Sequence, residues 1–356
     1  MVKFFKEWYT RKFSDPHAVT LVVMLMMAFL FIYFFSNLLM PVFVAIAIAF
    51  LLDLPVKRLT GFGVSHSLAV TAVVSAFVGF SLITVLGLVP VVWQQGSNLL
   101  QEVPHMITEG QTYLMALPEK YPELLEAEQI ESFITLINEK LIEWGQLVLQ
   151  ASLNSLSDLV ALIIYLILVP IMIFFFLKDK TELIQGVNRF LPNERRMASQ
   201  VGKEMNQQIL NYIRGKLIEI LIIGTVSTAA FLLLDLRYPV LLGVLVGLSV
   251  LVPYVGATIV TLPVMLVALF QWGISPEFGY VMLAYGIIQA LDGNLLVPIL
   301  FSEAVNLHPV TIIIAVILFG GLWGFWGVFF AIPLATLVKA VLNAWPASQD
   351  VETSNA

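Results

Sequence analysis

Asp292 is the ionisable residue of this sequence with the strongest case for a chemical role. It lies in an otherwise apolar stretch and is flanked by the amides Gln289 and Asn294. A carboxylate at membrane depth costs roughly 2.5–3.5 kcal/mol on insertion scales, so we expect it to face water or the protein interior. It could bind a cation, carry a proton or contact a polar substrate. The alternative interpretation is an anchor that only joins helices through hydrogen bonds.

Glu219 is the second candidate. Gln207, Asn211, Gly215 and Glu219 follow steps of four residues, which predicts a helix with one polar face. Lys216 lies three residues before Glu219 and could pair with it. Structural pairing near the membrane interface is favoured here over ion binding.

A charge-free run from Tyr238 to Pro276 contains a third group of candidates, Pro253, Tyr254 and Gly256. The run is long enough for two crossings or for a hairpin that turns back inside the membrane. Pro253 lacks a backbone donor and Gly256 can adopt unusual dihedrals, so a turn there would expose carbonyl groups. Such irregular backbone must be shielded by protein or line a water-filled cavity. We therefore expect this turn to meet the Asp292 helix around a polar site.

Enzymatic motifs are missing from the sequence. It has no glycine-rich phosphate loop and no H-E-x-x-H, its 4 histidines lack metal-ligand spacing, and it has 0 cysteines. We expect no enzyme activity, no cofactor, no metal and no nucleic-acid partner.

The elements that must position these residues are membrane helices. Hydrophobic residues make up 59% of the chain and charged residues only 12%, about half the charged share of soluble domains. The sequence predicts an all-α polytopic membrane protein with about eight membrane segments. Broken or re-entrant hairpins are expected at Tyr238–Pro276 and Ala304–Val338, the latter interrupted by a glycine–tryptophan stretch. A short break is expected at Ser36-Asn37, and the single crossings are Val19–Phe35, Leu38–Leu52, Leu68–Trp93, Leu156–Leu177, Leu217–Leu234 and Phe278–Leu300.

Basic residues predict the orientation. If the spans alternate, 15 of the 18 lysines and arginines fall on one side, which is then cytoplasmic. Both termini are expected there, in a bacterial inner membrane.

The opposite side receives residues 94–155, where nine glutamates face two lysines. Apolar residues recur there at steps of four and three, which predicts two helices with narrow apolar seams that form an extracytoplasmic hairpin. The hairpin either lies on the membrane part or mediates self-association or partner docking. The chain is thus divided into N-terminal membrane segments (1–93), the acidic region (94–155), a C-terminal transport core (156–346, with a cytoplasmic loop at 178–216) and a disordered tail (347–356).

Several stretches carry a resemblance to a known family: Trp8–Pro16, Lys203–Gln208, Asn211–Lys216, Pro253–Gly256, Leu291–Pro298, Asn306–Pro309, the glycine–tryptophan stretch and Ala331–Thr336. Together they resemble the autoinducer-2 exporter family of permeases. The resemblance implies an oligomeric inner-membrane permease that exports the autoinducer-2 signal or exchanges sodium for protons, with the Pro-Tyr-x-Gly turn and the Asp292 segment as its transport core.

We therefore expect a secondary transporter that exports a small polar solute or exchanges cations for protons. The alternative is a membrane scaffold without transport activity. It would bind a periplasmic protease or a cell-division protein through the acidic external helices.

Overall fold

The computed structural model describes residues 16–120, 132, 134–136, 139–140, 155–190, 196–253, 255–301 and 307–344. Within these ranges the chain is helical and contains no strand, so the all-α prediction is confirmed. The helices are α2 (Pro16–Gly61), α3 (His66–Lys120), α5 (Ser155–Lys178), α6 (Lys180–Phe190), α7 (Arg196–Leu233), α8 (Pro239–Ser249), α9 (Val255–Trp272), α10 (Pro276–Leu291), the π-helical turn η1 (Asp292–Leu296), α11 (Val297–Phe301) and α12 (Pro309–Ala344).

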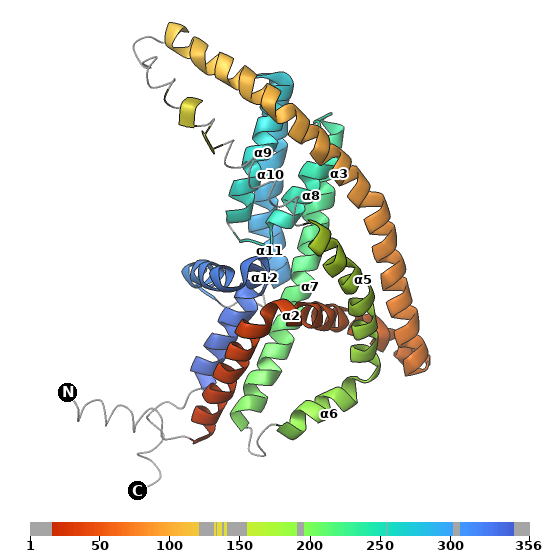
Figure 1. Ribbon diagram of the computed structural model, residues 1–356. Coiled ribbons are helices and arrows are strands. Elements are labelled where there is room, and N and C mark those ends of the chain that lie inside the picture. The colour runs from red at the N-terminus through yellow and green to blue at the C-terminus, as the bar shows by residue number, and fades with distance from the viewer. Residues whose placement is uncertain are drawn as a thin grey trace, which may run out of the picture.

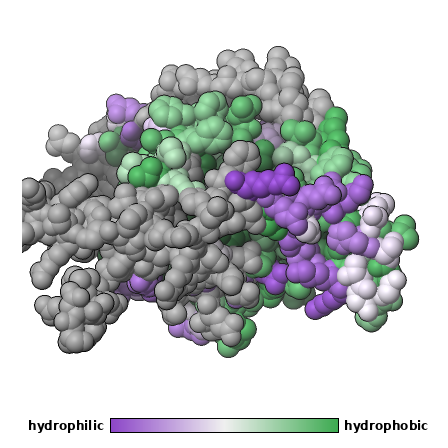
Figure 2. Space-filling view, turned by 90° about the horizontal axis from the view of Figure 1, so that it is seen from below, coloured by the Kyte–Doolittle hydropathy of each residue, from purple (hydrophilic) through white to green (hydrophobic). Residues whose placement is uncertain are grey.

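Six of the described helical segments are long and apolar enough to cross a membrane, and two apolar helices are shorter. The prediction of a polytopic membrane protein is confirmed. Large apolar side chains point outward, and Figure 2 shows them covering much of the described surface on one face. Lipid tails solvate such side chains as well as a protein core does. The six segments are Leu38–Gly61, His66–Thr112, Gln208–Leu233, Val255–Trp272, Pro276–Phe301 and Pro309–Asn343.

The predicted break at Ser36-Asn37 is wrong, and the helix of the third crossing is longer than the crossing itself. α2 continues as a helix through Ser36-Asn37, because a break inside the bilayer would leave backbone groups without partners. Instead α2 is one continuous but bent helix (Figure 1), and Pro41 and Pro55 lie inside it. α3 does not end at Trp93 but runs on to Lys120 as one helix of 55 residues. At 1.5 Å per residue it is about 80 Å long, so it projects well beyond a hydrocarbon core of about 30 Å.

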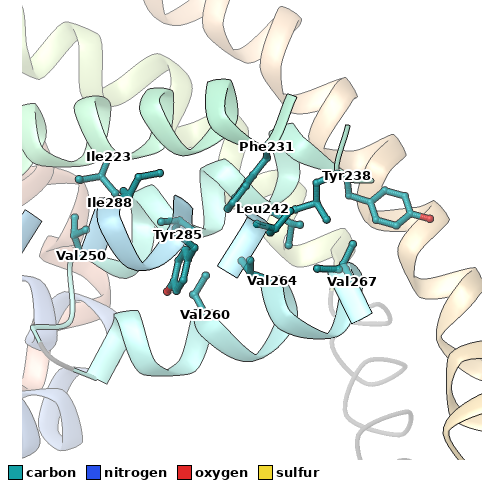
Figure 3. Packing of buried hydrophobic residues seen from close by; sticks show 14 residues of the cluster. Ile223, Phe231, Tyr238, Leu242, Val250, Val260, Val264, Val267, Tyr285 and Ile288 are labelled. Atoms are coloured by element: carbon teal, nitrogen blue, oxygen red, sulfur yellow. The ribbon is translucent and has the colours of Figure 1, made fainter. Parts of the chain in front are cut away.

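α8 lies directly on α7 because glycines leave the contact surface bare. A Cβ added to Gly247 would lie 2.8 Å from the Gly224 Cα, and one added to Gly243 would collide with Thr228. The spacing Gly243-x-x-x-Gly247 thus permits the two helices to approach closely. Helices α7 to α10 thereby enclose an apolar cluster, shown in Figure 3, that includes Ile223, Phe231, Leu242, Val246, Val260, Val264, Val281 and Ile288.

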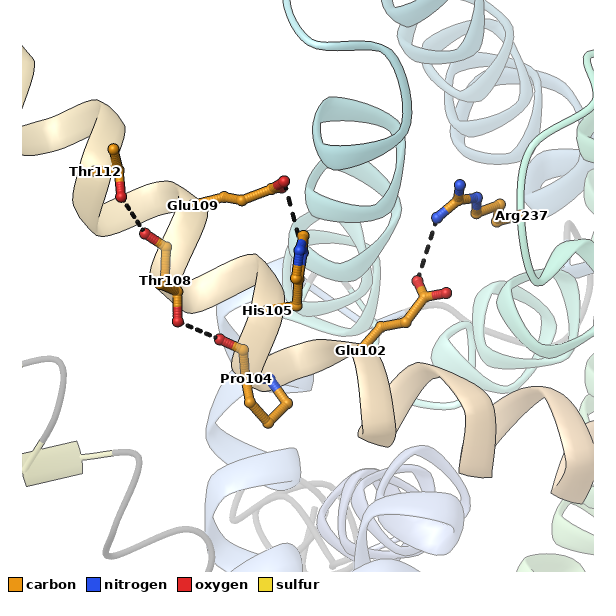
Figure 4. Close-up of polar contacts among 7 residues, drawn as sticks. All are labelled: Glu102, Pro104, His105, Thr108, Glu109, Thr112 and Arg237. Atoms are coloured by element: carbon orange, nitrogen blue, oxygen red, sulfur yellow. Dashed lines mark hydrogen bonds and ion pairs between the residues drawn. The ribbon is translucent and has the colours of Figure 1, made fainter.

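Polar contacts fix the two ends of the bundle. At one end, Asp53 Oδ2 of α2 accepts both from Lys57 at 2.9 Å and from Lys180 of α6 at 3.0 Å. At the other end, Glu102 of α3 pairs with Arg237 at 3.4 Å, between α7 and α8 (Figure 4). The Asp53–Lys180 and Glu102–Arg237 contacts join segments that are far apart in the sequence.

The glycine–tryptophan stretch breaks α12. Gly324 has φ 59° and ψ −137°, a conformation that side chains other than hydrogen strongly disfavour. A Cβ added to Gly327 would collide with the Phe319 carbonyl oxygen, so the two arms touch at the break. The predicted interruption of this hairpin is confirmed.

Candidate functional site

The turn between α8 and α9 interrupts a membrane helix at the predicted place. α8 ends at Ser249, Val250 caps it, and α9 begins at Val255. The Gly256 N–H donates to the Val252 carbonyl oxygen at 2.9 Å and closes the turn. Gly256 is buried against Ser249, where a Cβ would collide with the Ser249 carbonyl oxygen. The two helix ends therefore meet closely, and only glycine fits between them.

Lys216 of α7 links this turn to a buried acid. Its ammonium donates to the Val250 carbonyl oxygen at 2.7 Å and lies 2.8 Å from Glu219 Oε2. Lys216 is 4% exposed and Glu219 is 1% exposed. The ring of Phe301 lies below the ammonium at 5.2 Å, within the range of a cation–π contact. Gly215 provides the room, since a Cβ there would lie 2.6 Å from that ring.

Asp292 stands where α10 changes into the π-helical turn. It caps α10 and opens η1, so the helix widens by one residue at this carboxylate. Such turns often occur at functional sites. Its Oδ1 is buried and has no hydrogen-bond partner. The carboxylate interacts electrostatically with both Lys216 and Glu219.

Polar contacts hold α10 in register with α9. Pro276 opens α10, and the Ser275 hydroxyl accepts from the Phe278 N–H at 3.4 Å, as an N-cap does. Two turns before Asp292, the Tyr285 hydroxyl donates to the Ala257 carbonyl oxygen at 2.9 Å. This bond ties the Asp292 helix to the first turn of α9.

Lys216, Glu219 and Asp292 form what we call the buried charge cluster. With all three ionised, its formal charge is −1. A net charge is costly in a bilayer unless it is paired or hydrogen-bonded. One proton or one monovalent cation would neutralise it, which is the chemistry expected of an ion-coupling site.

The structure brings some predicted residues together and leaves others apart. Glu219 and Asp292 share the cluster, and the Pro253–Gly256 turn is joined to it through Val250. Asn294 is exposed and donates to the Ala290 carbonyl oxygen of its own helix at 2.8 Å, so it does not face the cluster.

The remaining two predicted residues are Gln289 and Tyr254. Gln289 lies one turn before Asp292, and its Nε2 is buried without a hydrogen-bond partner. Tyr254 lies outside the described residues.

Lys216 is the site residue that sequence reasoning undervalued. Its predicted pairing with Glu219 is present, but the pair is buried among helices inside a candidate span rather than exposed near an interface. Val250 and Phe301 were not considered, because an apolar side chain gives no signal for a carbonyl acceptor or a ring contact. The available signal is the group of charged residues Arg214, Lys216 and Glu219 within one candidate span.

The protein has helices suited to span a membrane, two breaks in them, and a buried charge cluster between them. These features define a polytopic membrane protein of the transport class. Residues 21–347 match the family described as "AI-2E family transporter". The chain belongs to this family, as the resemblance predicted, and is a membrane transport protein.

Named relatives agree with this assignment. The chain is 50% identical over 349 residues to "Putative permease PerM" of Escherichia coli strain K12, which covers 98% of this chain and 99% of the relative. It is 27% identical to "Putative transport protein YueF" of Bacillus subtilis, covering 87% and 85% of the two chains. "Putative transport protein MT0215" of Mycobacterium tuberculosis is 25% identical over 90% and 88%. All three are named as permeases or transport proteins and none as an enzyme.

Proposed function

We propose that the protein is a secondary transporter of the bacterial inner membrane, driven by a gradient of protons or monovalent cations. The observation that carries the proposal is the buried charge cluster with its formal charge of −1. Charged residues inside a membrane bundle mark ion pathways and proton relays. Broken membrane helices whose ends supply carbonyl groups are typical of transporter binding sites.

The cargo in this proposal is a small polar solute of the autoinducer-2 type, moved outward. This part draws on the family description alone. Exchange of a cation for a proton is the second form of the proposal. The buried charge cluster needs one positive charge for neutrality, and either a proton or a monovalent cation can supply it.

The proposed orientation has Lys57 and Lys180 in the cytoplasm and Arg237 outside. Lys57 and Lys180 both contact Asp53, which supports a common side for the two basic segments. Glu102 of the acidic region pairs with Arg237, which supports a common side for these two. Cytoplasmic termini and a homo-oligomer complete the proposal.

The scaffold alternative depends on a free external surface in residues 94–155. The first turns of this region are instead engaged within the chain: Leu99 packs on the apolar cluster of α7–α10, and Gln95 Oε1 accepts from the Leu241 N–H at 2.8 Å. These contacts favour a region that braces the membrane part, as the intramolecular interpretation expects.

The test is proton movement in proteoliposomes that carry a pH-sensitive dye inside. Addition of NaCl or of autoinducer-2 outside should move protons through the wild type, and Asp292→Asn should abolish this movement because the amide cannot titrate or carry charge. Asp235→Asn is the matched control: Asp235 is exposed in the α7–α8 connection, and its positive φ of 53° suits asparagine. Equal flux in wild type and Asp292→Asn would make Asp292 a structural anchor, with Glu219 next to be tested.

A further inference from the structure

Lys216 behaves unlike most lysines in membrane helices. A lysine near a helix end usually extends its ammonium toward the water interface. Lys216 lies inside the candidate span Gln208–Leu233 and directs its ammonium inward, onto two oxygen atoms of the protein. The proposed function does not explain why the Lys216 ammonium points inward. The following inference rests on that function and gives the reason.

The oxygens around the ammonium are those that a free cation would take. Hard cations prefer carboxylate and backbone carbonyl oxygens. Glu219 supplies a carboxylate and Val250 a carbonyl, at 2.8 and 2.7 Å. Val250 caps the end of α8, where carbonyl groups lack intrahelical partners and the helix dipole is negative.

A third oxygen of the buried charge cluster has no hydrogen-bond partner. Asp292 Oδ1 is buried, accepts no hydrogen bond, and belongs to a carboxylate that interacts with Lys216. Each of the three oxygens comes from a different element: α7, the α8 cap and η1. The charged and titratable groups that face the ammonium within the described residues are Glu219 and Asp292, with Tyr212 interacting with Glu219.

We propose that the Lys216 ammonium is a tethered substitute for the coupling cation, and that Lys216 and a free monovalent cation such as Na⁺ compete for the oxygens of Glu219, Val250 and Asp292. When the cation binds, Lys216 leaves the Val250 carbonyl, and the end of α8 is released from α7. When the cation leaves, Lys216 returns and pairs with Glu219 again. The two carboxylates thus face one positive charge in both states.

Removing the tethered charge should turn a cation-independent protein into a cation-dependent one. In Lys216→Gln, Na⁺ should take the vacated position and stabilise the fold by mass action. We expect the Tm of detergent-purified Lys216→Gln to rise by about 2–5 °C between zero and saturating NaCl, at constant ionic strength with choline chloride. Wild type and Lys216→Arg, which keep a tethered cation, should show a much smaller rise.

The double variant Lys216→Gln/Glu219→Gln is the matched control, because it removes the Glu219 carboxylate, one of the three proposed ligands, together with the Lys216 charge. Its Tm should be insensitive to the exchange of choline for Na⁺. An equal response to Na⁺ in Lys216→Gln and in the double variant would overturn the proposal. The proposal expects Na⁺ to take the place of the missing ammonium in Lys216→Gln. If Lys216→Gln aggregates in both NaCl and choline chloride while the double variant is folded, the proposal is also overturned.

The failure of this inference can be told apart from that of the proposed function. The Tm experiment measures binding and needs no flux, whereas the proteoliposome experiment measures flux. Loss of flux in Asp292→Asn without a specific Na⁺ response in Lys216→Gln would support the coupled transporter and refute the tethered cation. A specific Na⁺ response in Lys216→Gln together with normal flux in Asp292→Asn would support the Na⁺ site and refute the proposed role of Asp292 in coupling.

Discussion

Replacing Gly256 by alanine should loosen the α8–α9 turn and, through it, the buried charge cluster. The new Cβ would lie 2.6 Å from the Ser249 carbonyl carbon and 3.1 Å from the Ser249 Cα, whereas carbon atoms in contact are about 3.5–4.0 Å apart. The two helix ends must separate by roughly 1 Å to admit it. Overpacking of this kind costs about 1–3 kcal/mol of unfolding free energy.

The displacement reaches Lys216 because Ser249 precedes Val250, whose carbonyl oxygen accepts from the Lys216 ammonium. Loss of a hydrogen bond to a charged group costs about 1.5–3 kcal/mol more. At about 2.1 cal/mol/K of unfolding entropy per residue, each 1 kcal/mol lowers the Tm of a chain of this length by roughly 1–2 °C. Gly256→Ala should therefore lower the Tm by about 3–8 °C and reduce flux.

The matched control is Gly286→Ala on α10, where an added Cβ meets no atom within 4 Å. Alanine favours a helix over glycine by about 0.8–1.0 kcal/mol in solution, so this variant should keep or slightly raise the Tm. Thermal unfolding in detergent and dye-based flux in proteoliposomes measure both effects. Equal Tm values for the two variants would refute the argument that Gly256 is required by close backbone approach.

Two further predictions concern orientation and the α9–α10 contact. The chain has 0 cysteines, so Thr108→Cys and Glu182→Cys each carry a single thiol. An impermeant maleimide should label Thr108→Cys in intact cells and Glu182→Cys only after permeabilisation. The reverse labelling pattern would invert the proposed orientation. Tyr285→Phe removes a hydroxyl that lies 2.9 Å from the Ala257 carbonyl oxygen and 3.0 Å from Thr261 Oγ1, so it should lower the unfolding free energy by about 1 kcal/mol. A Tyr285→Phe protein as stable as the wild type would mean that apolar packing alone holds α10 on α9.

Features encoded in neighbouring residues were predictable from the sequence. The α8–α9 break depends on Pro253 and Gly256, and the α12 break on a run of glycines that ends the regular helix at Gly324. α5 was predicted to within a residue at each end, because its apolar run is bounded by polar residues. The third crossing was predicted to end at Trp93 from the change from apolar to polar composition, whereas the helix itself continues to Lys120. Composition marks where a helix leaves the bilayer, not where its hydrogen bonding stops.

The buried charge cluster was only partly predictable because its members meet through the tertiary fold. The pairing of Lys216 with Glu219 follows from their spacing of three residues on one helix. The contact of Lys216 with Val250 joins residues 34 positions apart, and it depends on α8 packing against α7 through glycines. The widening of the helix at Asp292 has no clear sequence signal beyond the poor helix formers Gly293 and Asn294 that follow it.

The helix breaks and the charge cluster coincide for a physical reason. The carbonyl groups at a helix end lack intrahelical partners, so they can accept from a buried ammonium, as Val250 at the end of α8 accepts from Lys216. Under the proposed function, any motion of the α8–α9 hairpin away from α7 must break this bond and leave the ammonium to Glu219 and Asp292. A cation that neutralises Asp292 or displaces Lys216 changes the cost of that motion. The ion and the position of the hairpin are then energetically coupled in both directions, which is what a gradient-driven transporter requires of its site.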